Sequence, residues 1–107
     1  MINKILNNKY YIEEQIAQGG FCSVYKGFDL HEKYFQNDIS YVAIKIPNDY
    51  LMSKIDINAY IYAEYTLLKN LSSKNIVKVL DFGIDVDSNK PYFILEYLKG
   101  YYFQIKE

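Results

Sequence analysis

The stretch IAQGGFCSVYKGFDL (residues 16–30), followed after a polar connection by SYVAIKIP (residues 40–47), decides the fold of this chain. Its first part alternates apolar and polar residues on both sides of Gly19 and Gly20, which is typical of two strands joined by a tight turn. Its second part is an apolar strand that holds one lysine, Lys45. The sequence therefore predicts two strands folded over a glycine turn, with a third strand beside them.

Lys45 is the unusual residue of this stretch. An ammonium group buried among valine, alanine and isoleucine needs an anion as its partner. Two strands that fold over a Gly-Gly turn present backbone N–H groups, and the lysine on the next strand adds a point charge. This combination predicts a site that holds a phosphate group.

The composition indicates one globular domain. The chain has 107 residues, of which 50% are hydrophobic, and a formal net charge of −1, which fits neither a disordered segment nor a basic nucleic-acid-binding surface. No apolar run approaches the ~18–20 residues of a membrane span, and the first eight residues lack a signal peptide's apolar stretch, so a cytoplasmic location is expected. The single cysteine, Cys22, excludes an intramolecular disulfide bond and a cysteine-based metal site.

The pattern of residues predicts an α+β fold, with a five-stranded antiparallel sheet and one main helix. The expected elements are a short lead at 2–8 with a helical turn as an option, strands at 10–17, 22–28, 41–46, 76–86 and 91–97, a polar excursion at 29–40, and a helix at 57–71. Pro47 is expected to end the third strand. Alternation along the first strand predicts two faces, one with Tyr11, Glu13 and Gln15 and the other with Ile12, Glu14 and Ile16.

Glu64 lies in the middle of the expected helix, whose start Asp56 or Ser53 would cap and whose end falls at residues 72–75. Glu64 is near the same helix face as Leu68 and Leu71. A carboxylate among leucines on a core-facing stripe needs a cation, and Lys45 is the candidate. The alternative interpretation is a surface glutamate on an amphipathic helix.

These segments resemble the small lobe of a eukaryotic-like Ser/Thr protein kinase. Residues 42–45 match the V-A-I-K motif of that family's third strand in full. The glycine-rich loop, G-x-G-x-x-G-x-V, is kept only in part, since Ala17 and Cys22 replace its first and third glycines. Glu64 is similar in place to the helical glutamate that pairs with the lysine and holds it against the α- and β-phosphates of ATP.

The resemblance also implies an ATP pocket. Residues 75–80 resemble the entry to the family's fourth strand, and residues 92–98 resemble its fifth strand and hinge. By this resemblance Leu95 is the gatekeeper residue at the back of the pocket. The Glu96 carbonyl and the Leu98 backbone groups form hydrogen bonds with the edge of the adenine ring. Ile16, Val24 and Ala43 supply the apolar surfaces that enclose the ring. The implied catalytic residues are Lys45 and Glu64, and the implied nucleotide-binding residues are Ile16, Ala17, Gly19, Gly20, Phe21, Cys22, Val24, Ala43, Lys45, Leu95, Glu96 and Leu98.

Asp81, Phe82 and Gly83 spell D-F-G, the family's magnesium-binding motif. In the family this motif follows an H-R-D catalytic loop, whereas here it precedes the hinge-like segment, and the chain has no arginine and no H-x-D. The sequence therefore predicts that Asp81 lies on the fourth strand and binds no metal.

The resemblance covers residues 1–107 as a single, incomplete kinase domain that lacks the large lobe. The preferred interpretation is an ATP-binding small lobe that transfers no phosphate alone, with Mg²⁺ bound only if a large lobe completes the site. That lobe, or another protein, is expected to cover the apolar underside. The alternatives are a stand-alone, pseudokinase-like regulatory module and an unrelated small α+β domain.

Overall fold

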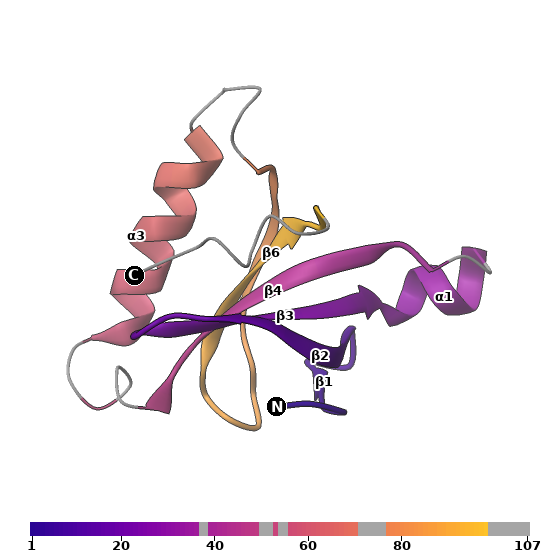
Figure 1. Ribbon diagram of the computed structural model, residues 1–107, viewed down its shortest axis with the longest axis horizontal. Helices are drawn as coiled ribbons and strands as arrows, with labels where there is room; N and C mark the ends of the chain where they lie inside the picture. Colours follow the sequence, from indigo (N-terminus) through magenta and orange to yellow (C-terminus); the bar gives the residue numbers. More distant parts are fainter. Residues whose placement is uncertain (37–38, 50–52, 54–55, 71–76, 99–107) are drawn as a thin grey trace.

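A computed structural model of the chain describes residues 1–36, 39–49, 53, 56–70 and 77–98. Within them, one six-stranded antiparallel sheet has the order β1-β2-β3-β4-β6-β5, α3 packs against one of its faces, and α1 projects from the end of β3 (Figure 1). The elements are β1 (Ile5–Leu6), β2 (Tyr10–Gln18), β3 (Cys22–Asp29), α1 (Leu30–Gln36), β4 (Tyr41–Pro47), α3 (Ile57–Asn70), β5 (Val79–Ile84) and β6 (Pro91–Glu96). The α+β class is confirmed, and the described residues contain one strand and one helix more than predicted.

The additional strand, β1, replaces the helical turn considered for residues 2–8. Ile5 and Leu6 pair with Tyr11 and Tyr10 of β2. The chain reverses between the two strands at Asn7 and Asn8, whose φ angles are 50° and 58°. Asparagine tolerates this left-handed conformation, which ends a right-handed helix but suits a tight hairpin.

The additional helix, α1, lies in the segment predicted as a polar excursion. Asp29 caps it, because its Oδ1 accepts hydrogen bonds from the backbone N–H groups of His31 (2.8 Å) and Glu32 (3.4 Å). An acidic N-cap followed three residues later by glutamate is a known start signal of helices, so this signal was present in the sequence. None of the residues of α1 is buried, and its lack of an apolar stripe explains why periodicity did not predict it.

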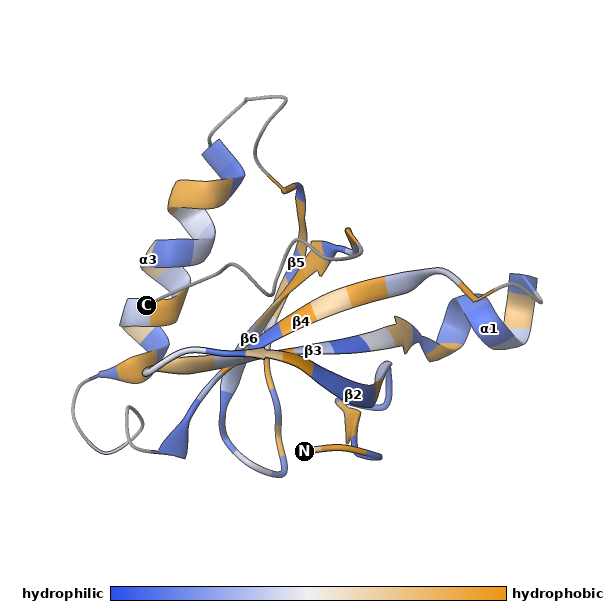
Figure 2. Cartoon of the chain, viewed as in Figure 1, coloured by the Kyte–Doolittle hydropathy of each residue, from blue (hydrophilic) through white to orange (hydrophobic). Residues whose placement is uncertain are grey.

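Alternate residues of β4 and β6 build a core on each face of the sheet. On the face covered by α3, Ala43, Phe93 and Leu95 pack with Ile57 and Ile61 of the helix. On the opposite face, a second cluster contains Leu6, Tyr10, Ile12, Val42, Ile44, Ile46, Tyr92 and Ile94. The hydrophobic colouring of β4 in Figure 2 reflects this burial on both sides. A strand buried on both faces reads as a nearly continuous apolar run, and Lys45 interrupts it.

The predicted faces of the first strand are wrong beyond Ile12. Ile12 belongs to the cluster opposite α3, whereas Ile16 belongs to the cluster beneath α3. The register of β2 against β3 shifts between Ile12 and Glu14 and again between Gln15 and Ala17. Each β-bulge inserts one residue and disturbs the simple alternation of faces. The bulges thus turn Ile16 toward the face that carries Lys45.

The helix and the last hairpin follow the prediction with shorter bounds. Asp56 rather than Ser53 caps α3, since its Oδ1 accepts a hydrogen bond from the Ala59 N–H (3.3 Å). The predicted helix end at 71–75 and the strand start at 76 lie outside the described residues. The strand β5 ends at Ile84 because the Asp85 carboxylate accepts hydrogen bonds from Ser88 and forms the turn. In the described part of the chain, no helix has the length and apolar character needed to cross a membrane.

Candidate functional site

The ion pair predicted between Lys45 and Glu64 is present. Lys45 on β4 extends toward α3, and its Nζ lies 2.5 Å from the Glu64 Oε1. The Lys45 side chain is 9% exposed and that of Glu64 is 28% exposed, so the two charges meet where the apolar core opens to solvent. A partly buried pair of this kind is strongly favoured over an isolated buried ammonium. The alternative of an unpaired surface glutamate is wrong.

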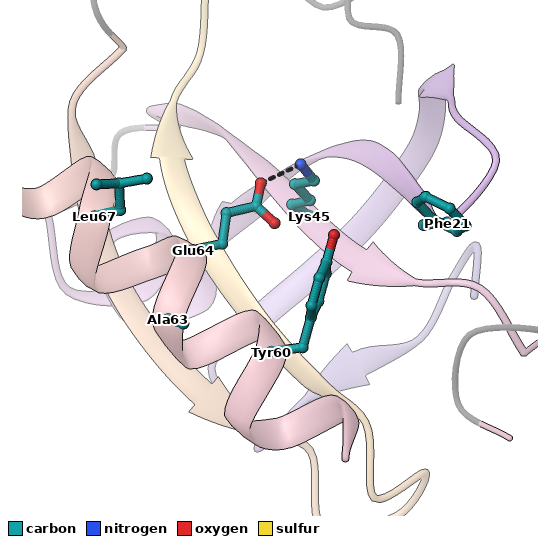
Figure 3. A pocket seen from close by; sticks show the side chains of 6 residues that line it. All are labelled: Phe21, Lys45, Tyr60, Ala63, Glu64 and Leu67. Atoms are coloured by element: carbon teal, nitrogen blue, oxygen red, sulfur yellow. Dashed lines mark hydrogen bonds and ion pairs between the residues drawn. The ribbon is translucent and has the colours of Figure 1, made fainter. Parts of the chain in front are cut away.

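The pair borders an open pocket of about 480 Å³. Its described lining residues are Phe21 of the glycine-containing turn, Lys45 of β4, and Tyr60, Ala63, Glu64 and Leu67 of α3. Figure 3 shows Tyr60 and Glu64 extending from the helix toward Lys45, with Phe21 on the far side of the lysine. The pocket therefore has a cation and a carboxylate within an otherwise mainly apolar rim, which is a common composition for a ligand site.

The turn between β2 and β3 adopts a conformation that its non-glycine residues can hold. Among the described residues other than glycine, positive φ angles occur only at Asn3, Asn7, Asn8 and Asn89. Ala17 and Cys22, which replace two glycines of the family's loop, therefore lie in backbone conformations that any L-residue adopts. The loss of these glycines does not by itself prevent the turn from forming.

The residues predicted to enclose a nucleotide base are brought together on one face of the sheet. Ile16, Val24, Ala43 and Leu95 all belong to the cluster beneath α3 and are at most 8% exposed. Ala17 packs against the same cluster. These residues form a continuous apolar floor, but they are not among the described residues that line the pocket at Lys45. Of the predicted nucleotide-binding residues, Lys45 and Phe21 line that pocket.

The predicted hinge begins at the last residue of β6. Glu96 is the last residue of that strand, and its Oε1 accepts a hydrogen bond from the Lys78 N–H (2.9 Å). The Glu96 N–H donates to the Lys78 carbonyl (2.9 Å), so this position is tied to the chain just before β5. Leu98 is 41% exposed. The segment thus leaves the sheet at the edge of the apolar floor formed by Ala43 and Leu95.

The residues of the D-F-G sequence lie within β5, as predicted, and each has a structural contact. The Asp81 Oδ2 accepts a hydrogen bond from the Tyr10 hydroxyl (2.8 Å) and lies 3.5 Å from the Lys9 ammonium. Burial raises the pKa of the Tyr10 hydroxyl above its ordinary value, and the bond to Asp81 raises it further. Phe82 packs against Tyr62 and Tyr65 of α3. These contacts give Asp81 and Phe82 structural roles, one at the side of Tyr10 and the other against α3.

Sequence reasoning missed Tyr60, Ala63 and Leu67 as lining residues, because helical periodicity assigns these apolar residues to the helix but gives them no role in a site. In the structure the buried residues of α3 are Ile57 and Ile61. Tyr60 stands four positions before Glu64 and Leu67 three positions after it, which places both beside the glutamate on the helix surface. Ala63 directly precedes Glu64 and lines the same pocket. That spacing was the available signal.

Known proteins resemble this chain along nearly its whole length. Residues 10–104 match the family model of protein tyrosine and serine/threonine kinases. A probable serine/threonine-protein kinase of Clostridium perfringens is 36% identical over 94% of this chain, MAP3K epsilon protein kinase 1 of Arabidopsis thaliana is 39% identical over 92%, and serine/threonine-protein kinase tousled-like 2 of Homo sapiens is 36% identical over 89%. The chain spans 13%, 6% and 12% of these relatives, respectively. With its paired Lys45 and Glu64 beneath a folded hairpin, this chain belongs to the protein tyrosine and serine/threonine kinase family.

Proposed function

We propose that this chain is the ATP-binding small lobe of a serine/threonine protein kinase. The observation that carries the proposal is the 2.5 Å contact between Lys45 and Glu64 at the rim of an open pocket. The carboxylate holds the ammonium at the edge of the core, where it would meet the α- and β-phosphates of ATP. The serine/threonine class rests on the names of the similar kinases.

The remaining predicted residues would surround the rest of the nucleotide. The turn of Gly19, Gly20 and Phe21, with Ala17 and Cys22 beside it, would cover the phosphates with backbone N–H groups. Ile16, Val24, Ala43 and Leu95 supply an apolar floor for the base. The Glu96 carbonyl and the Leu98 backbone groups would recognise the adenine edge.

Phosphoryl transfer would require further polypeptide. The chain contains no arginine and no H-x-D sequence, so the general base and the magnesium ligands of the family's mechanism would come from elsewhere. We propose that this lobe binds ATP weakly alone and transfers no phosphate, and that Mg²⁺ joins the site when a second lobe supplies its ligands.

The second lobe is also the proposed partner. Phe21, Tyr60 and Leu67 around the pocket are 41%, 43% and 63% exposed. Exposed apolar side chains that gather in one area are typical of a surface that another protein covers. A large lobe placed there would shield the nucleotide from water and bring the catalytic residues to its γ-phosphate.

A thermal-unfolding titration with ATP tests the binding site. If the dissociation constant were about 1 mM, then ~10 mM ATP would stabilise the fold by roughly 1.4 kcal/mol. Lys45→Ala should abolish the ATP-dependent shift. Lys33→Ala is the matched control, since it removes the same charge from α1, outside the described pocket lining. An unchanged shift in Lys45→Ala would contradict the proposed site.

A radiolabelled-phosphate assay tests the absence of activity. The pure chain should label neither itself nor a general protein substrate, whereas robust turnover would contradict the need for a second lobe. No ATP-dependent shift in the wild-type chain would instead favour the regulatory module, in which the same surface binds only a protein.

A further inference from the structure

Asn48 connects the end of β4 to the turn between β2 and β3. Its backbone N–H donates a hydrogen bond to the Phe21 carbonyl (2.7 Å), and its side-chain Nδ2 donates to the Gly19 carbonyl (3.2 Å). Its Oδ1 accepts a hydrogen bond from the Ser23 hydroxyl (2.8 Å). One residue, three positions after Lys45, thus bonds to both sides of the turn and to the strand that follows it.

The Asn48 side chain lies on the face of the sheet opposite Lys45. Its partner Ser23 is paired in register with Ile46, and Ile46 belongs to the cluster on the face away from α3. Lys45 extends toward α3 on the other face, as Figure 3 shows. The amide group of Asn48 therefore holds the turn from behind, as seen from the pocket.

This contact determines where the Gly20 N–H group of the turn points. The described residues contain no cis peptide bond, and in a trans peptide unit the C=O and N–H groups point in opposite directions. Because the Gly19 carbonyl points to Asn48, the Gly20 N–H of the same peptide unit points to the side that carries Lys45. No described residue accepts a hydrogen bond from the Gly20 or Phe21 N–H groups.

The turn has little packing that would hold this orientation otherwise. Gly20 is exposed, and a Cβ at that position would meet no atom within 4 Å. Phe21 is 41% exposed. Within the turn, the Gly19 N–H donates to the Cys22 carbonyl (2.8 Å). Hydrogen bonds therefore dominate the order of this segment, and Asn48 makes two of them.

We infer that Asn48 is a positioning residue that aims the Gly20 N–H group of the Gly19–Phe21 turn at a phosphate group of a nucleotide. The inference rests on the proposed ATP site, since it states how this turn becomes competent to bind an anion. Asn48 itself touches no phosphate. It acts by keeping the carbonyl oxygens of Gly19 and Phe21 away from the anion, whose charge they would repel.

Amide hydrogen exchange tests the positioning without any nucleotide. In Asn48→Ala, exchange at Gly19 should accelerate about tenfold, as expected for the loss of one hydrogen bond that holds a small segment. The rate at Ile44 on the central strand reports global unfolding, so the Gly19-to-Ile44 ratio separates a loosened turn from a destabilised protein. Asp49→Asn is the matched control, because Asp49 pairs with Lys90 beside Asn48 and makes no hydrogen bond or ion pair with the described residues of the turn.

Nucleotide binding tests the consequence. Asn48→Ala should weaken ATP binding about five- to tenfold, the effect of losing one oriented donor, and should leave adenosine binding unchanged because adenosine has no phosphate. Ser23→Ala should show a smaller change in the same direction, and the double variant should be no weaker than Asn48→Ala. Ser23→Ala also keeps the test open if Asn48→Ala does not fold.

The outcomes of the two measurements are distinguishable. An unchanged Gly19-to-Ile44 ratio in both variants overturns the positioning role, as does equal weakening of ATP and adenosine. If the wild-type chain bound neither nucleotide, the proposed function would fail, and the exchange ratio would still decide whether Asn48 orders the turn.

Discussion

Lys45 and Glu64 are nineteen positions apart in the chain, on a central strand and on the helix beside it, and their charged groups meet at 2.5 Å. The lysine is the more buried partner, with 9% of its side chain exposed against 28% for the glutamate. The two residues therefore depend on each other unequally. Loss of the Glu64 carboxylate removes an anionic partner from an ammonium that is mostly buried, whereas loss of the ammonium leaves a carboxylate that water already reaches.

This asymmetry predicts that Glu64→Gln destabilises the fold more than Lys45→Met. We expect Glu64→Gln to lower the free energy of unfolding by about 1–3 kcal/mol. This is less than the loss expected for breaking a fully buried ion pair, because Glu64 is partly solvated. Lys45→Met keeps the buried stem and removes the charge, so its effect should be smaller. Urea unfolding at pH 7 measures both, with Lys69→Met on the exposed side of α3 as control. Equal losses would contradict the asymmetry.

Two glycines should differ in their tolerance of alanine. A Cβ at Gly27 would overlap the Tyr11 carbonyl on the neighbouring strand β2 and would lie 2.8 Å from the Ile44 Cδ1. Gly27→Ala should therefore reduce the free energy of unfolding by at least about 2 kcal/mol through backbone displacement. Gly20→Ala meets no atom within 4 Å and should change it by less than about 0.5 kcal/mol. Thermal unfolding of both variants provides the comparison.

Asn7 should matter more than its neighbour Asn8, although both have positive φ angles. The Asn7 Nδ2 donates to the Ile84 carbonyl (2.8 Å) and its Oδ1 accepts from the Val86 N–H (2.9 Å), which ties β1 to the end of β5. Alanine at either position meets the same backbone strain, but only Asn7→Ala loses these bonds. We expect it to be about 1–3 kcal/mol less stable than Asn8→Ala in urea unfolding. Similar values would show that this tie contributes little.

The free energy of unfolding should fall at alkaline pH, in part because of Tyr10. Folding raises the pKa of its hydroxyl through burial and through the bond to Asp81. As pH rises, the unfolded chain therefore releases the Tyr10 proton before the folded chain does, at about pH 10. The contribution of Tyr10 to the free energy of unfolding is complete below that pH and is lost as pH rises further.

Tyr10→Phe isolates this contribution. At pH 7 the wild type should be more stable by about 0.5–1.5 kcal/mol, the value of one hydrogen bond. The difference in the free energy of unfolding between wild type and Tyr10→Phe should shrink between pH 9 and pH 11 in urea unfolding. In that range the wild type loses the Tyr10 proton when it unfolds, whereas the variant has no proton to lose at this position. A difference that stays constant over this range would argue against the raised pKa.

The local pattern of apolar and polar residues was sufficient to predict the strands around Val24, Lys45 and Phe93 and most of the helix around Glu64. Strand alternation and helical period depend only on residues that are neighbours in the chain. The same reasoning failed at Ile16, where two bulges alter which face a side chain takes. It also failed at residues 30–36, where a polar helix is started by the Asp29 cap and has no buried stripe. Neither failure concerns the residues that form the ion pair.

The amino-acid sequence alone determined the α+β class, the glycine turn, the lysine in an apolar strand and the likeness to the kinase small lobe, since these are features of short segments. Only the tertiary structure decided that Lys45 reaches Glu64, that Ile16 joins the floor beneath α3, and that Asn48 holds the turn from behind. Those three relationships join residues distant in the chain. They depend on strand register, bulges and helix placement, which arise from the packing of the whole sheet.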